Sequence, residues 1–280
     1  MNVFAHRRDP NNPGDYWSSP GMWLNHELPG QIFDYPELAR LQGHTIDNLI
    51  IGGGGFGAKW IDRINVFLSN NSVRRTVLWG TGWEKGRLDL EQFRSCCDIM
   101  GIREWLPDTA DHLDWVPCAS VFHSELPKLA EHQPTQDWLI IDHWKRKKIK
   151  FKPVHTRMKN RMSSMDQIIE AIADHNIVLT SSYHVVYWSI LLRRRVVFIS
   201  NPWLPKVDHM RWPVPRAETF SWELIDQTQI YPDAYDQALQ ANLDFLDKVQ
   251  CLAGLPAQYN VVADSVNDPS SPTQAEIDGS

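Results

Sequence analysis

The residues with the clearest chemical potential are four polar side chains that separate two apolar segments: Ser181, Ser182, Tyr183 and His184. Hydroxyls and backbone N–H groups at the start of a helix bind anions, and histidine exchanges protons near neutral pH. The run therefore predicts a site for an anionic group, with His184 as the acid or base. The alternative is structural, with the serines capping a helix and the imidazole bonded to a neighbouring carbonyl.

The segment from Asn176 to Ser200 supplies the elements that would hold this run. It predicts a strand at Ile177–Leu179, a helix that begins at Ser181 or Ser182 and ends near Arg193–Arg195, and a strand at Val196–Ile199. The helix is apolar on nearly every side, which indicates that it is buried. The polar run would then lie where a strand's carboxyl end meets a helix's amino end, the place where open α/β sheets bind ligands.

A second signal is the glycine run Gly52–Gly55, which follows an apolar strand at Leu49–Ile51 and precedes Phe56 and a predicted helix at Ala58–Leu68. Glycines let backbone N–H groups approach a ligand closely, so Gly53, Gly54 and Gly55 are candidate anion contacts. The pattern matches neither the dinucleotide fingerprint nor the P-loop. The alternative is a tight turn that binds nothing.

A third signal is the loop Asn12–Asp15, which follows a short predicted strand at Asn2–Ala5. Asp15 could position an acceptor hydroxyl or cap a helix, and Asn12 and Gly14 could touch a ligand or hold the loop's shape. A further strand, Thr76–Trp79, also runs into glycines. Because the carboxyl ends of parallel strands share one edge of a sheet, these turns predict one cleft.

The order of elements predicts an α/β protein of two domains, residues 1–132 and 133–262, followed by a disordered tail at 263–280. The second half is expected to hold a strand at Trp138–Ile141, a basic loop at Lys145–Lys159 and a helix at Met165–Asp174. The first half is expected to hold a helix at Leu88–Met100 and to end with the segment Asp114–Val121. A late amphipathic helix, Pro232–Ala253, could pack back across the first domain.

Composition narrows the class of protein. The formal charge is −6 in 280 residues, which argues against a general nucleic-acid binder. Four cysteines without CxxC spacing indicate thiols in a reducing cytoplasm, and no apolar run is long enough for a membrane span. The sequence has neither metal-ligand spacing nor a serine-hydrolase motif. It leaves open whether the chain forms a homo-oligomer. The thirteen tryptophans fill cores or stack on sugars.

Taken together, these signals resemble those of the polysaccharide pyruvyl transferase family. The resemblance rests on Asn12-Pro13-Gly14-Asp15, on Gly52–Gly55 with Phe56, and on Ser181-Ser182-Tyr183-His184, and it extends from about Asn12 to Ile199. It implies two Rossmann-like lobes facing a cleft, as in GT-B glycosyltransferases. It also implies phosphoenolpyruvate as donor, a saccharide as acceptor and no cofactor, in cell-surface polysaccharide synthesis. A lipid-linked acceptor and a peripheral place at the inner membrane face stay open.

The chain departs from the family at the late turn. Many members have Arg-Leu-His there, whereas this chain has Ser182-Tyr183-His184 and so lacks an arginine that holds donor anions. Two alternatives therefore remain. One is a GT-B glycosyltransferase that uses a nucleotide sugar, and the other is a catalytically degenerate carbohydrate-binding relative.

The pyruvyl-transfer hypothesis assigns a role to each candidate. His184 would donate and accept protons, starting as a neutral base at a helix amino terminus, and Asp15 would assist. Gly53, Gly54, Gly55, Ser181, Ser182 and Tyr183 would bind donor anions, with charge from Arg194, Lys145 or Arg157. Asn12, Gly14 and Phe56 would position the acceptor or the loop. Most of the basic run Lys145–Lys152 could equally be solvated surface.

Overall fold

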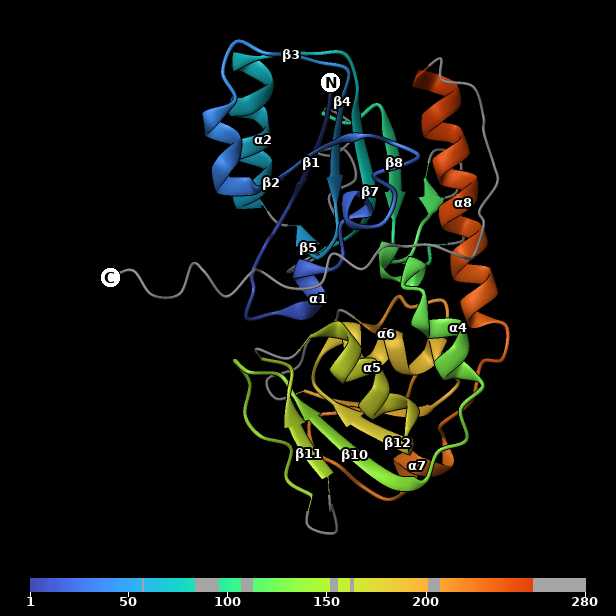
Figure 1. Cartoon of the computed structure of the whole chain (residues 1–280). Coiled ribbons are helices and arrows are strands. Elements are labelled where there is room, and N and C mark those ends of the chain that lie inside the picture. The colour runs from blue at the N-terminus through green and yellow to red at the C-terminus, as the bar shows by residue number, and fades with distance from the viewer. Residues whose placement is uncertain are drawn as a thin grey trace, which may run out of the picture.

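The computed structural model describes residues 1–56, 58–83, 96–106, 113–151, 156–161, 164–200 and 207–253. The predicted tail at 263–280 and most of the predicted helix at Leu88–Met100 lie outside these ranges. The described chain is mixed α/β and is built on two parallel sheets, which Figure 1 shows one above the other. The boundary between residues 132 and 133 stays a prediction.

The first sheet belongs to the N-terminal half, and all its pairings are parallel. Its order is β2-β1-β4-β7-β8-β9, with β5 beside β7, while β3 and β6 form a separate pair. The strands are β1 (Asn2–His6), β2 (Gly30–Asp34), β3 (Thr45–Ile46), β4 (Asn48–Gly52), β5 (Gly55–Phe56), β6 (Ser72–Val73), β7 (Thr76–Trp83), β8 (Ile99–Ile102) and β9 (Asp114–Trp115).

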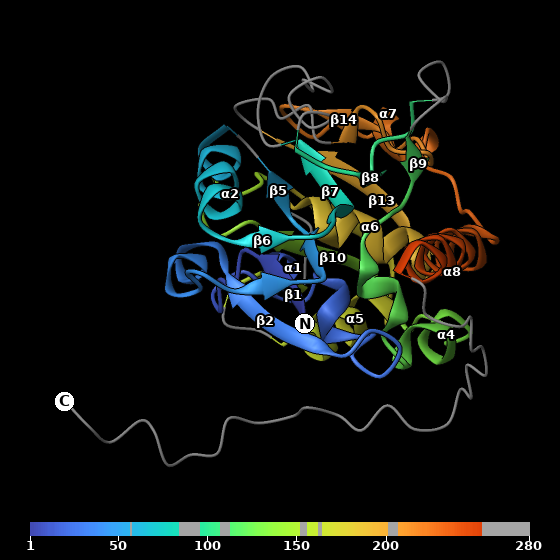
Figure 2. The ribbon, with the colours of Figure 1, turned by 90° about the horizontal axis from the view of Figure 1, so that it is seen from above.

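The two faces of the first sheet are covered by elements from opposite ends of the chain. Successive strand residues point to opposite faces, so Val3 and Ala5 pack against α2 (Ala58–Asn70) and the 3-10 helix η2 (Tyr35–Arg40). Phe4 lies on the other face with Phe245 and Leu246 of α8 (Ala234–Ala253). Both figures place α2 and α8 on opposite sides of the strands (Figures 1 and 2).

The second sheet has the order β11-β10-β12-β13-β14, again parallel throughout. One face packs on α5 and α6, and the other on Ile149 and α7. Its elements are β10 (Gln136–Asp142), β11 (Thr156–Lys159), α5 (Met165–Ala173), β12 (His175–Thr180), α6 (Tyr183–Leu191), β13 (Arg195–Ile199), β14 (Arg216–Ala217) and α7 (Glu223–Asp226).

Short helices connect these layers. In the first half they are α1 (Pro13–Tyr16) and the 3-10 helices η1 (Pro20–Met22) and η4 (Ala119–Phe122), followed by α4 (Glu125–Ala130). Helix α1 contacts α6, so the loop after β1 reaches the second half of the molecule. No helix in the described ranges is long and apolar enough to cross a bilayer.

Both sheets reverse their winding at the same kind of point. In the first sheet β2 lies on one side of β1, and the next strand of the sheet, β4, lies on the other side. In the second sheet β11 and β12 flank β10 in the same way. Crevices at the carboxyl ends of such strand pairs are the usual ligand sites of open α/β sheets. The expected sites are therefore the loops after His6 and Gly52, and those after Asp142 and Thr180.

Helix α6 is buried along its whole length, as its composition predicts. All nine residues are buried, because α5 lies beside it, the second sheet lies on one side, and η4 and the start of α8 also pack on it. The helix ends at Leu191, and Arg193 turns the chain into β13 with a left-handed φ of 58°. That conformation is unusual for a residue with a side chain.

Three sequence predictions are wrong in their boundaries. Strand β7 does not end at Trp79 but continues through the glycines to Trp83, with a register shift between Leu78 and Thr81. Gly80 has a φ of 59° at this irregularity, which explains why a glycine interrupts a strand here. Met100, predicted to end a helix, lies in β8. Strand β11 lies within the predicted basic loop.

Candidate functional site

A pocket of about 410 Å³ lies at the carboxyl edges of both sheets. It is lined from the first half of the chain by Arg7, Asp9, Asn12, Asp15, Gly55, Trp60 and Arg103. It is lined from the second half by His143, Trp144, Lys145, Arg146, Ser181, Ser182, Tyr183, His184 and Phe198. The loops at both winding reversals therefore contribute to the same cavity.

The three turns singled out in the sequence meet at this pocket. Asn12, Asp15, Gly55 and the run Ser181–His184 all line it. Gly14 lies directly against the imidazole, since a Cβ on Gly14 would be 2.2 Å from His184 Nδ1. The structure brings these residues together, and their chemical roles stay predictions.

The glycine turn is shaped by two left-handed residues. Gly53 and Gly54 have φ values of 79° and 71°, which side chains rarely allow. A Cβ on Gly53 would be 2.1 Å from Ser18 Oγ, and one on Gly54 would be 3.1 Å from Asp15 Oδ1. The turn therefore packs on the loop that carries Asp15. Phe56 lies in β5, and its side chain is outside the described part of the structure.

The serines of the late turn do not cap helix α6. Ser182 occupies the N-cap position, yet its side chain makes no cap hydrogen bond. Its Oγ accepts a hydrogen bond from Asn160 Nδ2 at 3.2 Å, while Ser181 Oγ accepts one from the His143 N–H at 3.1 Å. Thr180 Oγ1 accepts from the Ser182 N–H instead. The prediction that the serine side chains cap the helix is thus wrong, and their hydroxyls join neighbouring loops instead.

His184 is mostly enclosed but reaches the pocket. Its exposure is 5%, its ring centroid is 5.4 Å from that of Tyr183 and 5.8 Å from that of Trp188, and it is among the lining residues. Asp15 lies in the first turn of α1, where Asn12 Nδ2 donates to its Oδ2 at 2.6 Å. A held carboxylate and an enclosed imidazole at one pocket can exchange protons with a bound ligand.

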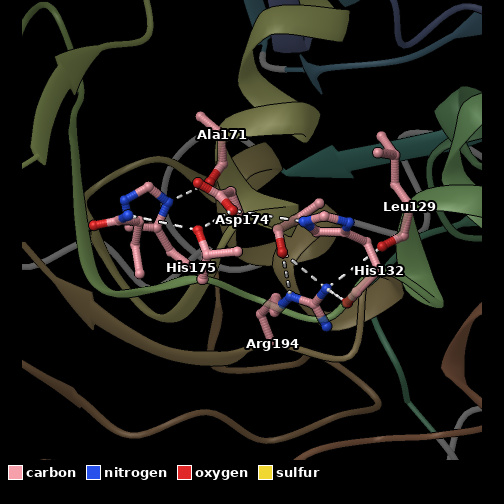
Figure 3. A network of polar contacts seen from close by, with 9 residues as sticks. Leu129, His132, Ala171, Asp174, His175 and Arg194 are labelled. Atoms are coloured by element: carbon pink, nitrogen blue, oxygen red, sulfur yellow. Dashed lines mark hydrogen bonds and ion pairs between the residues drawn. The ribbon is translucent and has the colours of Figure 1, made fainter.

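Two of the predicted cations serve the fold instead. Arg194 lies beyond the far end of α6, a helix of about 14 Å by its length, and does not line the pocket. Its guanidinium donates to the carbonyls of Ala173, His132 and Leu129 (Figure 3). Arg157 donates to Asp142 Oδ2 at 2.6 Å and does not line the pocket. The expectation that Arg194 holds a donor anion is therefore wrong.

Lys145 does line the pocket, together with cations that sequence reasoning missed. The lining contains Arg7, Arg103, Lys145 and Arg146 against the carboxylates of Asp9 and Asp15. This local excess of positive charge contrasts with a chain of formal charge −6. A cavity of this kind concentrates anions. Arg7 directly follows β1 and could have been found from that position, whereas Arg103 follows β8, a strand that the sequence did not predict.

Arg103 is the most enclosed of these cations. It is 3% exposed, and its Cζ lies 3.9 Å from the ring centroid of Tyr183. Burial raises the pKa of the Tyr183 phenol, against the influence of Arg103, so the ring stays neutral and presents its face to the cation. Both side chains line the pocket.

Two tryptophans also line the pocket. Trp60 comes from α2, and its ring centroid is 4.8 Å from that of Tyr35. Trp144 follows β10, with Lys145 Nζ 4.3 Å from its ring centroid. Aromatic faces stack on sugars and on nucleobases. Among the described residues, no group of three histidine, cysteine, aspartate or glutamate side chains could hold a metal ion.

His6 is the last residue of β1 and directly precedes Arg7 of the pocket lining. It is fully buried, and its Nε2 lies 3.1 Å from the carbonyl oxygen of Tyr16. Burial lowers the pKa of His6 from 6.5 to about 4, with a further contribution from Arg8, while the Tyr16 carbonyl acts in the opposite direction. The imidazole is therefore neutral at pH 7, and it fixes α1 to the end of β1.

Comparison with known proteins gives similarity in structure alone. No protein-family model and no curated protein matches the chain. A protein of uncharacterised function from Klebsiella pneumoniae subsp. pneumoniae NTUH-K2044 has a TM-score of 0.51 at 16% identity, over 74% of this chain and 86% of that one. Escherichia coli ADP-heptose lipopolysaccharide heptosyltransferase II has a TM-score of 0.35 at 12% identity, over 89% of this chain and 99% of that one. The first likeness concerns the fold alone, and the second is too low to indicate a shared function.

Proposed function

We propose that this chain is a transferase that moves the pyruvyl group of phosphoenolpyruvate to a saccharide, forming a ketal. The observation that carries the proposal is the meeting of His184, the Asp15 loop and four cations at one pocket. Phosphoenolpyruvate carries a carboxylate and a phosphate, and the cations with the amino end of α6 suit such a ligand. The acceptor is a saccharide, with its lipid-linked form and a cytoplasmic location as further expectations.

The architecture supports the proposal in a general way. Each half of the chain has a parallel sheet whose winding reverses next to this pocket. We propose that the halves act as two Rossmann-like lobes of the GT-B type, one holding the donor and the other the acceptor. Ligands of such proteins meet at the carboxyl edges of both sheets, so both substrates could reach His184.

The chemistry requires proton transfer at two kinds of atom. One sugar hydroxyl gives its proton to neutral His184, which passes a proton to the methylene carbon of the donor, so that the neighbouring carbon becomes electrophilic and bonds to the hydroxyl oxygen. A second hydroxyl then displaces phosphate, which takes up the proton of that hydroxyl, and the ketal closes. Asp15 binds the acceptor. The pocket cations bind the departing phosphate.

A second candidate is glycosyl transfer from a nucleotide sugar. Trp60 and Trp144 line the pocket, and either ring could stack on a nucleobase. The cations would then bind a diphosphate in place of phosphoenolpyruvate. The two candidates therefore differ in the donor, while they share the pocket.

Donor binding separates these candidates. We expect phosphoenolpyruvate to raise the melting temperature of the protein, since a ligand at a hundred times its Kd stabilises by about 2.7 kcal/mol. A panel of nucleotide sugars should leave it unchanged. Stabilisation by a nucleotide sugar alone would replace the first proposal with the second.

Turnover then tests the role of His184. Replacing His184 with Gln should lower kcat by about 10²- to 10⁴-fold, because general acid–base groups contribute this much. His44→Gln is the matched control, because His44 is exposed and does not line the pocket, and it should retain full activity. Full activity in His184→Gln would remove the catalytic assignment. Glycan binding without turnover in the parent protein would favour a non-catalytic relative.

A further inference from the structure

Arg103 has an environment that a buried cation rarely has. Its Nε is enclosed and has no hydrogen-bond partner among the described residues. The nearest carboxylate contact is Glu104 Oε1, which lies 3.9 Å from Nε and so beyond hydrogen-bonding distance. Burying a guanidinium without full hydrogen bonding is unfavourable, and such groups are normally paired. Arg103 therefore has a long ion pair with Glu104, while its Nε makes no hydrogen bond within the described residues.

The position of the guanidinium is nonetheless well defined. On one side it lies over the ring of Tyr183, with 3.9 Å from Cζ to the ring centroid. On the other side it fills the space beside Gly82 in β7, where a Cβ would be 1.7 Å from Arg103 Nε. Only glycine at position 82 leaves room for the arginine in this place. The first sheet thus holds a cation against the first residue of α6.

The amino end of α6 adds a second attraction for an anion at the same place. Tyr183 is the first residue of this nine-residue helix, and the Ser182 side chain does not cap it. The amino end of a helix carries partial positive charge and unsatisfied N–H groups. Ser182, Tyr183 and Arg103 all line the pocket.

We propose that Arg103, Tyr183 and the amino end of α6 form an anion subsite that binds a carboxylate or phosphate group of the donor. A guanidinium offers a planar pair of donors that matches either group. The subsite supplies from β8 the positive charge that the late turn lacks at Ser182. The identity of the donor rests on the proposed function, whereas the subsite itself rests on the burial and contacts of Arg103.

Three variants test the subsite, with Kd measured by calorimetry for inorganic phosphate, pyruvate and phosphoenolpyruvate. We expect Arg103→Met to weaken binding of phosphoenolpyruvate by about 10- to 100-fold, the range for hydrogen bonds to charged groups. Arg103→Lys keeps the charge but loses the planar pair, and it should weaken binding by less. Gly82→Ala leaves Arg103 in the chain but displaces its guanidinium, so it should also weaken binding. Arg40→Met, at an exposed arginine, is the control and should bind as the parent does.

The outcomes separate this inference from the proposed function. If Arg103→Met is folded by circular dichroism and binds phosphoenolpyruvate as tightly as the parent, the subsite is wrong and the donor stands. If a nucleotide sugar binds instead, and Arg103→Met weakens it, the subsite stands and the donor is wrong. If the parent binds none of the anions and no nucleotide sugar, the subsite is overturned.

Discussion

The two ends of helix α6 each have a buried arginine, and the two arginines differ in their partners. At the amino end, Arg103 is 3% exposed, and its Nε has no hydrogen-bond partner within the described chain. Beyond the other end, Arg194 is 6% exposed and donates to Ala173 O and His132 O at 2.9 and 2.6 Å. Burial and charge are thus alike, and the difference lies in what surrounds each guanidinium.

Helix ends explain why Arg194 is satisfied. Ala173 lies in the last turn of α5, where carbonyl groups lack intrahelical partners, and Leu129 lies in the last turn of α4, where its carbonyl also accepts from the His132 N–H at 3.2 Å. Arg194 donates to both, so one guanidinium joins the carboxyl ends of two helices. At the pocket, in contrast, helix α6 presents its amino end, which offers donors and no acceptors. A cation there needs an anion from elsewhere.

The largest expected effect separates the two arginines by stability. Arg194→Met should lower the free energy of unfolding by about 3–5 kcal/mol, because buried carbonyls lose a charged donor. Arg103→Met should change it by less than about 1 kcal/mol in the absence of ligand, because the change removes a buried charge whose Nε makes no hydrogen bond and whose ion pair with Glu104 is long. Urea unfolding of both variants measures the difference. Equal losses would contradict the distinction drawn between the two ends.

The second effect is a loss of about 3 kcal/mol in the free energy of unfolding as the pH falls. The pKa of His6 is 6.5 when unfolded and about 4 when folded, so the unfolded chain takes up a proton first as the pH falls. The contribution of the neutral imidazole is present above pH 6.5, and about 3 kcal/mol of stability is lost as the pH falls towards 4. Urea unfolding across this range should show a shallower pH dependence in His6→Gln than in the parent.

Exposed histidines give the control for that measurement. His44→Gln should retain the full pH dependence of the parent, since His44 is exposed. If His6→Gln and His44→Gln lose stability with acid to the same extent, the buried His6 is not a source of the pH dependence of the free energy of unfolding.

The smallest effect concerns the contact between Gly14 and His184. Gly14→Ala should lower stability by about 2 kcal/mol, because the new methyl group overlaps the imidazole and overpacking is unfavourable. It should also lower turnover by displacing the ring. In a His184→Ala background the same change should have a smaller effect on stability, and a double-mutant cycle measures that coupling. Additive effects on stability would show that residue 14 and the His184 side chain are not in steric contact.

Sequence patterns predicted the local features well and the distant partners poorly. The buried helix α6 and the turns at Asn12–Asp15, Gly52–Gly55 and Ser181–His184 follow from apolar runs, glycines and polar strand ends. These features are local, and parallel strands bring their carboxyl ends to one edge. The partner of a cation is not local, so Arg194 was predicted to bind a donor anion although it binds backbone carbonyls.

The missed strands share a physical reason. Strand β11 has the sequence Thr-Arg-Met-Lys, and only its pairing with β10 marks it as a strand. Strand β8 contains Gly101, where a Cβ would be 2.6 Å from Val116 Cγ2, so the glycine reflects close packing that the sequence does not display. Pairing with neighbouring strands decided both elements, and in β11 it did so against the local propensity. Arg103 was missed because it follows one of them.

Helix α8 has a consequence for how the chain can be made and divided. Phe245, Leu246 and Val249 cover Phe4, Ile50 and Trp79 of the first sheet, and Asn242 accepts a hydrogen bond from the Trp79 indole at 2.9 Å. During synthesis the first sheet leaves the ribosome well before α8 does. The apolar face of the sheet therefore stays exposed to solvent until the last turns of α8 emerge. A fragment cut after residue 132 would keep that face exposed and would aggregate, whereas the same fragment supplied with α8 as a separate peptide should stay in solution.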